Sequence, residues 1–247
     1  MSIAPKAVTP AEPDVEYPET DGQPMGETHY HVIAILTLYE TLAYHFRQRR
    51  MYVAADMFLY YQKGAPSKNK APDVMVIKGV KNYPRRTFKT WEEKAIPCVI
   101  FEITSEKTKA EDQGPKKDVY EKLGVKEYFI FDPEAKYLKP PLQGFRLKGT
   151  QYVPIAFNQD GSLTCKELKL LLTPEGHLLR LTDVKTGQRL LTSDERANQE
   201  AERAEQERQR AEQEKQRAEQ EKQRADGLAA EVERLRAEIE AAKQKPI

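Results

Sequence analysis

The segment CVIFEIT (98–104) is nearly continuous in apolar residues and carries one charged residue, Glu102. Such a run is typical of a strand that is buried on both faces. Residues 111–123 next predict a helix that ends at Gly124, and residues 126–132 predict another strand. A strand, a helix and a strand in succession indicate a right-handed crossover between parallel strands. This part of the chain therefore predicts an α/β fold.

Upstream of this unit the spacing of apolar residues is helical. Ile33, Leu36 and Ala43 fall on one face of a helix that we expect over about 28–49. Thr28 stands where its side chain could cap the first turn.

Short apolar runs broken by turn residues predict the remaining strands. Two are expected over 52–61 and 72–77, followed over 79–95 by a loop with room for a short helix. Residues 136–192 are interrupted by Gly and Pro, which predicts edge strands and hairpins, with room for a short helix near 166–172. The expected core is a mixed β-sheet flanked by helices.

Composition divides the 247 residues into three parts. Residues 1–26 are rich in Pro, Glu and Asp and predict a flexible N-terminal arm, and residues 27–193 form the expected globular domain. Residues 194–247 hold 15 acidic and 12 basic residues, which leaves 24 acidic and 28 basic residues, a net charge of +4, for the rest. That charge is weak support for a nucleic-acid partner, because phosphate binding needs clustered Lys and Arg.

Other classes of protein are disfavoured by what the sequence lacks. Cys98 and Cys165 have no CxxC spacing, which argues against a zinc site or a disulfide scaffold. No apolar run approaches the ~20 residues of a membrane span, and the N-terminus has no apolar leader segment. We therefore expect a cytoplasmic protein with no membrane partner.

The C-terminal part is a seven-residue repeat of strong helix formers. It reads AEQERQR, AEQEKQR, AEQEKQR from Ala204, and predicts a long helix. Over 197–225 a solvated single helix is favoured, because Glu occupies the second apolar position of each repeat. Over 226–242 Leu228, Val232 and Leu235 have the spacing of a coiled coil, so self-association as a homodimer is a hypothesis.

Three segments carry residues suited to metal-dependent chemistry. Asp73 opens one expected strand, Glu102 lies near the end of the next, and Lys116 lies on the helix that follows. Two carboxylates at strand ends can hold Mg²⁺ or Mn²⁺ through hard oxygen ligands, and the carbonyl of Ile103 could complete the site. A lysine beside the metal can orient water and stabilise charge on a phosphate. The alternative is a structural ion pair, because Glu102 would be costly to bury without a partner.

These segments resemble the Uma2 family of restriction-type endonucleases (DUF820), within the PD-(D/E)xK nuclease superfamily. The resemblance rests on APDV from Ala71, IFEITSEKT from Ile100, DQGPK from Asp112, and GVKEYFIFDP from Gly124, and it spans roughly residues 25–192. It implies a restriction-endonuclease-like fold, a divalent metal on Asp73 and Glu102, and a nucleic-acid substrate that we expect to be DNA.

The resemblance also implies where the lysine stands. The plain motif would place it two residues after Glu102, where this chain has Thr104, whereas the Uma2 pattern places it on the next helix, at Lys116. Asp112 and Tyr120, one turn before and after, are expected to support it, and Lys117 is the competing lysine, about 100° away on the helix. The family's loop proline is missing from Ser105–Thr108.

A polar residue early in the first helix is also common in this family. Glu27, His31 and Glu40 are the candidates, and Glu40 lies nearest to the apolar stripe. His31 is otherwise expected to be a surface or packing residue. A basic stretch over 78–94 is either a solvated loop or a phosphate-contacting flap whose Tyr83, Phe88 and Trp91 could stack on bases.

Three functions remain open on the sequence. The first is a Mg²⁺-dependent endonuclease that hydrolyses DNA phosphodiesters. The second is a catalytically silent nucleic-acid- or protein-binding module of the same fold. The third is a structural protein whose C-terminal helix mediates assembly.

Overall fold

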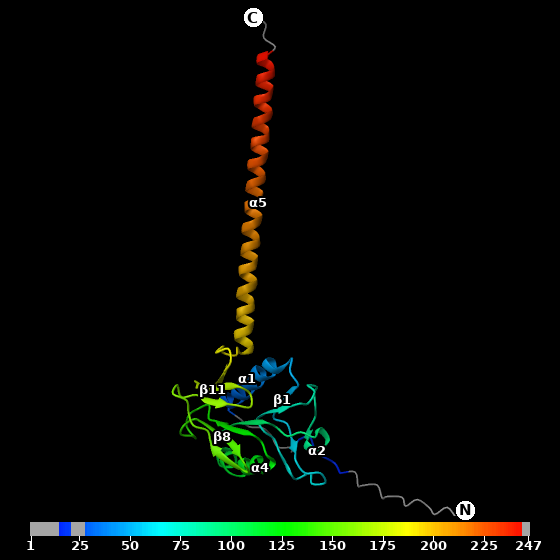
Figure 1. Cartoon of the computed structure of the whole chain (residues 1–247), viewed down its shortest axis with the longest axis vertical. Helices are drawn as coiled ribbons and strands as arrows, with labels where there is room; N and C mark the ends of the chain where they lie inside the picture. The colour runs from blue at the N-terminus through cyan, green and yellow to red at the C-terminus, as the bar shows by residue number, and fades with distance from the viewer. Residues whose placement is uncertain (1–14, 21–27, 244–247) are drawn as a thin grey trace, which may run out of the picture. The chain divides into compact units, whose positions relative to one another are not determined.

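The computed structural model describes residues 15–20 and 28–243, apart from the side chains of residues 239 and 241–243. The chain divides into two compact units, Met1–Ser193 and Asp194–Ile247 (Figure 1). Residues 15–20 contain no helix or strand, and the rest of the predicted N-terminal arm lies outside the described residues.

A six-stranded sheet forms the centre of the first unit, in the order β1-β4-β6-β7-β8-β9. The middle pair, β6 and β7, is parallel, as the strand–helix–strand pattern predicted, and all other neighbours are antiparallel. The strands are β1 (Met51–Ala55), β4 (Val74–Lys78), β6 (Val99–Ile103), β7 (Glu127–Phe131), β8 (Leu142–Lys148) and β9 (Gln151–Pro154). The mixed sheet and its helices confirm the predicted α/β class.

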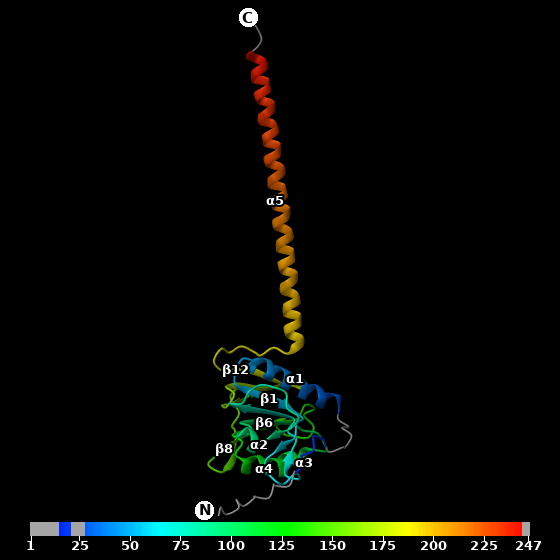
Figure 2. The same cartoon turned by 90° about the vertical axis from the view of Figure 1, so that its right-hand side faces the viewer.

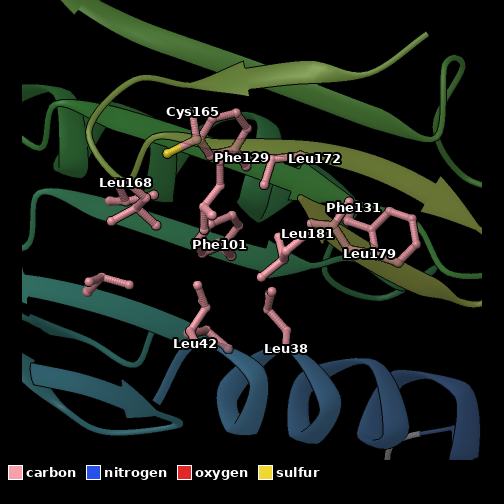
Figure 3. Close-up of a cluster of buried hydrophobic side chains, with 14 of the residues drawn as sticks. Leu38, Leu42, Phe101, Phe129, Phe131, Cys165, Leu168, Leu172, Leu179 and Leu181 are labelled. Atoms are coloured by element: carbon pink, nitrogen blue, oxygen red, sulfur yellow. The ribbon is translucent and has the colours of Figure 1, made fainter. Parts of the chain in front are cut away.

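Helix α1 (His29–Phe46) covers one face of this sheet. Thr28 caps it, accepting a hydrogen bond of 3.3 Å from the His31 amide, as predicted. Its buried residues Leu38 and Leu42 point toward Phe101 of β6 (Figure 3). The same face is covered by a small antiparallel sheet of β10 (Leu163–Cys165), β11 (Leu170–Glu175) and β12 (Leu178–Asp183).

Glu127 joins the small sheet to the main one. Its buried carboxylate accepts hydrogen bonds from Arg146 Nε (2.7 Å), Cys165 Sγ (3.0 Å) and the amides of Lys166 (3.1 Å) and Glu167 (2.9 Å). A carboxylate with this many donors is stable in the interior because each oxygen is satisfied. Cys98 and Cys165 are both free and buried.

The opposite face packs on helix α4 (Pro115–Leu123) and on Leu59 and Phe88. The last two belong to a second small sheet of β2 (Leu59–Tyr60), β3 (Asn69–Lys70) and β5 (Phe88–Lys89), followed by α2 (Thr90–Glu93). Figure 2 shows α1 on one side of β1 and β6 and α4 on the other.

Three predicted elements differ from the observed ones. The strand expected over 52–61 is split into β1 and β2 by Asp56, whose φ of 47° breaks the extended backbone. The helix over 111–123 is two helices, α3 (Lys109–Gln113) and α4, because Pro115 follows Gly114 and starts a new first turn. The short helix near 166–172 is wrong, since Leu170 and Leu172 are in β11, where they pack into the core.

The second unit consists largely of α5 (Ser193–Lys243), one continuous helix of 51 residues. All side chains described beyond residue 196 of this helix are exposed. In the part of the chain that the structure describes, no helix combines the length and the apolar character needed to cross a membrane.

Candidate active site

The pairing of β4 with β6 brings Asp73 and Glu102 together. Val74 is paired with Phe101 in this antiparallel ladder, so one further step places Asp73 opposite Glu102. The Asp73 amide donates to Glu102 Oε2 (3.3 Å), and the Ile103 amide donates to Asp73 Oδ2 (2.6 Å). The two carboxyl groups, 29 residues apart in the chain, are therefore held side by side by the sheet backbone.

Strand alternation turns Glu102 toward helix α4. Phe101 and Ile103 point to the α1 face, so Glu102 shares the other face with Ile100. There Glu102 Oε2 accepts a hydrogen bond from Lys116 Nζ (2.9 Å), and Oε1 accepts one from the Tyr120 hydroxyl (2.7 Å). Glu102 is fully buried, so these contacts replace the water that its carboxylate loses.

Lys116 is held by a second carboxylate. Its Nζ lies 3.0 Å from Asp112 Oδ1, on the preceding turn, while the Thr104 hydroxyl donates to Asp112 Oδ2 (2.8 Å). The Tyr128 hydroxyl donates to the Asp112 carbonyl (2.8 Å). Thr104 occupies the position at which the PD-(D/E)xK motif has its lysine. In this chain its hydroxyl group holds Asp112, and Asp112 in turn holds Lys116. Sequence reasoning missed this role.

The charges of this cluster do not balance. Burial raises the pKa of Asp73 to about 7 and that of Glu102 to about 8, although the ammonium of Lys116 opposes both shifts. Burial alone would lower the pKa of Lys116, but Glu102 and Asp112 hold it above its ordinary value. Three carboxylates around one ammonium leave a net charge of −2 when all are ionised. A divalent cation would supply the missing charge.

The donor set fits a hard divalent metal that keeps several waters. Two adjacent carboxylates are the protein share that Mg²⁺ takes in such sites, and the rest of its octahedron is water and phosphate oxygen. Among residues 15–20 and 28–243, no group of three or more His, Cys, Asp or Glu side chains is arranged to bind a metal by itself. The amide of Ile103, whose carbonyl was the third predicted ligand, fixes Asp73.

A pocket of about 850 Å³ opens beside Asp73. Its walls come from α1, β1 and the loop of Tyr83 and Arg85. His31 lines it next to Asp73, with Nε2 3.9 Å from Asp73 Oδ2. A substrate group bound in this pocket would contact the less buried of the two acids, whose side chain is 18% exposed.

The polar residue that α1 brings to the site is His31. It lies on the buried face of the helix with Ala34 and Leu38, three and seven residues further on. This helical spacing is the sequence signal that could have indicated that His31 is buried. Glu40 was the wrong choice, because it is exposed and accepts a hydrogen bond from Ser193 Oγ (2.7 Å). Glu27 lies outside the described residues.

Two other predicted groups are placed elsewhere. Lys117 Nζ lies 4.0 Å from the centre of the Phe145 ring, away from Glu102. In the basic stretch, Arg85 is bound by Glu93 (2.6 Å), and Phe88 is fully buried and cannot stack on a base. Tyr83, 49% exposed, remains accessible at the pocket.

The family of this chain follows from comparison with known proteins. Residues 5–173 match the family model of Uma2, described as "Putative restriction endonuclease". This chain belongs to the Uma2 family. A crystal structure from Anabaena variabilis, described as "a putative nuclease belonging to DUF820", is similar at 13% identity and a TM-score of 0.41, covering 60% of this chain and 80% of that one. The comparison with curated proteins gave no match.

The match to the Uma2 family model covers most of the first unit. The matched residues include Asp73, Glu102 and Lys116. The family is described by nuclease activity, so a nucleic acid is the substrate class that it indicates.

Proposed function

We propose that this chain is an endonuclease that uses Mg²⁺ or Mn²⁺ to hydrolyse phosphodiester bonds in DNA, and that residues 27–193 carry the reaction. The observation that supports it most is the ammonium of Lys116, 2.9 Å from Glu102, next to the paired carboxyl groups of Asp73 and Glu102. Membership in Uma2 adds the substrate class.

In this proposal Asp73 and Glu102 hold the metal. A divalent cation bound there would activate a water molecule and stabilise the negative charge that grows on the phosphate. Asp73 is fixed by the Ile103 amide, and Glu102 is fixed by Tyr120, so both oxygen donors are oriented before any ligand arrives. Such preorganisation avoids the cost of ordering the ligands during the reaction.

Lys116 would orient the attacking water and stabilise the phosphate oxygens. Its raised pKa keeps it charged at neutral pH, so it would act as a hydrogen-bond donor and a fixed positive charge and would not act as a base. Asp112 is a positioning residue that holds Lys116 toward Glu102, and Thr104 holds Asp112 in turn. The pocket beside Asp73 is where the scissile phosphate and its neighbouring nucleotide would enter.

Nicking of supercoiled plasmid DNA tests the proposal. The wild type should cut with Mg²⁺ or Mn²⁺ and not with EDTA, whereas Asp73→Asn, Glu102→Gln and Lys116→Met should each lose at least about a hundredfold in rate. Lys117→Met is the matched control for Lys116→Met, because its side chain packs on Phe145, and it should retain activity. Metal-independent cutting, or unchanged cutting in Asp73→Asn and Glu102→Gln, would refute the proposal.

A catalytically silent binding module is the alternative that the sequence left open. Its binding would be indifferent to Mg²⁺ and would survive Asp73→Asn. The excess of buried carboxyl groups counts against it, because burying three of them beside one ammonium is costly and a module without a metal would gain nothing from it.

A further inference from the structure

Helix α5 exposes a narrow apolar stripe near its C-terminal end. Leu228, Val232 and Leu235 are 68%, 47% and 46% exposed, and they follow one another at steps of four and three residues. On a helix this spacing places them along one line. Large apolar side chains in a stripe on a charged helix mark a surface that another helix covers.

The stripe belongs to a heptad register that runs through the whole helix. If Val232 is position a and Leu235 is position d, every a position from 197 onward is apolar. The a positions are Ala197, Ala204, Ala211, Ala218, Ala225, Val232 and Ile239, and the d positions are Glu200, Glu207, Glu214, Glu221, Leu228, Leu235 and Ala242. The register is unbroken, but the apolar seam is complete only after Glu221.

The residues in this seam indicate how many helices it joins. β-branched residues at a with Leu at d favour two strands in a parallel coiled coil. The chain has Val232 and Ile239 at a, with Leu228 and Leu235 at d. The occupant of the stripe is therefore expected to be a single helix of matching register.

The charges that flank the seam indicate which helix this is. Glu231 and Glu238 occupy g positions, and Arg236 and Lys243 occupy the e positions five residues later. In a parallel, in-register pair each g residue meets the e residue five positions on in the other helix, so Glu meets Arg or Lys at every such contact. Antiparallel pairing would instead oppose Glu to Glu and Arg to Lys.

We propose that α5 binds α5 of a second copy of this chain as a parallel, in-register, two-stranded coiled coil over residues 225–243. The repeats over 204–224 do not drive the association, because Glu occupies their d positions and Arg or Lys occupies both their e and g positions. The dimer is thus joined by a short seam, and it dissociates on dilution.

Sedimentation velocity of the full chain over a concentration series tests the association. The wild type should shift from monomer to dimer, and Leu228→Glu with Leu235→Glu should remain monomeric throughout. Ala230→Glu with Ala237→Glu is the matched control at the outward-facing f positions, and it should dimerise like the wild type. A wild type that stays monomeric, or a dimer that survives in the Leu variant, overturns the proposal.

Two further variants test the orientation. Val232→Cys should form an interchain disulfide under mild oxidation, because equal a positions meet in a parallel pair, whereas Ala230→Cys should not. Glu231→Arg with Glu238→Arg should raise the dimer Kd by about tenfold or more, and adding Arg236→Glu with Lys243→Glu should restore it. If adding Arg236→Glu and Lys243→Glu does not restore the dimer Kd, parallel pairing is refuted. None of these readouts depends on nuclease activity.

Discussion

Replacing Lys116 by Met would remove the ammonium group that contacts both Glu102 and Asp112. The Lys116 side chain is 12% exposed and its partners are 0% and 1% exposed, so solvent screens these pairs weakly. Removing one partner of a buried ion pair typically costs about 3–5 kcal/mol, because the other charge is left without compensation. For a domain of this size, about 3 kcal/mol corresponds to a fall in Tm of roughly 6–12 °C.

The loss should depend on pH in a defined direction. The pKa of Lys116 is raised above its ordinary value of 10.5 in the folded protein. Its stabilising contribution is therefore complete at any pH below 10.5, and it would be lost only as the pH rises through the higher pKa of the folded state. Asp73 and Glu102 have folded pKa values of about 7 and about 8, so they are largely neutral at pH 6 and need the ammonium less there. Metal-free Lys116→Met should therefore lose most stability at pH 9 and least at pH 6.

Urea unfolding of the metal-free protein at both pH values measures the difference. Lys117→Met is the control, because its side chain packs on the Phe145 ring, a contact expected to contribute about 0.5–1 kcal/mol. The reasoning is refuted if the two variants lose equal stability at pH 9, or if the loss in Lys116→Met is the same at pH 6.

Three other measurements follow from the site and its surroundings. The affinity for Mn²⁺ should fall as the pH drops below 8, and well below pH 7 the fall should approach about a hundredfold per pH unit, because both Asp73 and Glu102 must lose a proton to bind the ion. Calorimetry that shows no proton release on binding would contradict this. Tyr120→Phe should destabilise the fold by about 1.5–3 kcal/mol in urea unfolding, since it removes the 2.7 Å hydrogen bond to Glu102, and an unchanged midpoint would speak against that bond. Gly144→Ala should cost about 1–3 kcal/mol in the same assay, because its Cβ would lie 2.8 Å from the buried Phe129 ring, whereas a neutral effect would show that the ring can move.

Local signals in the sequence were sufficient for the principal helices and strands. The apolar run around Glu102 and the cap at Thr28 depend on neighbouring residues alone, and both are confirmed. The helix predicted near 166–172 was wrong because a run of leucines is compatible with the periodicity of a helix and with that of a strand. The strand forms because it packs Leu170 and Leu172 into the core beside the main sheet, which is a tertiary contact.

The site was predictable only in its parts. Helical phase is local, so Lys116 could be separated from Lys117, and the structure places them on different neighbours. The meeting of Asp73 and Glu102 depends on the antiparallel register between β4 and β6, which are separated in the chain by a segment that contains β5 and α2. No local pattern encodes that register. The roles of Thr104 and His31 likewise depend on which element packs beside them.

The hydrogen bond from the Ile103 amide to Asp73 Oδ2 links a backbone group of the central sheet directly to a candidate ligand. Any ion that draws electron density from that carboxylate would alter the environment of one amide proton. In a ¹⁵N-labelled sample, the Ile103 resonance would then act as a built-in sensor. A diamagnetic ion such as Mg²⁺ could be titrated against it, and site occupancy would be read without substrate and without turnover.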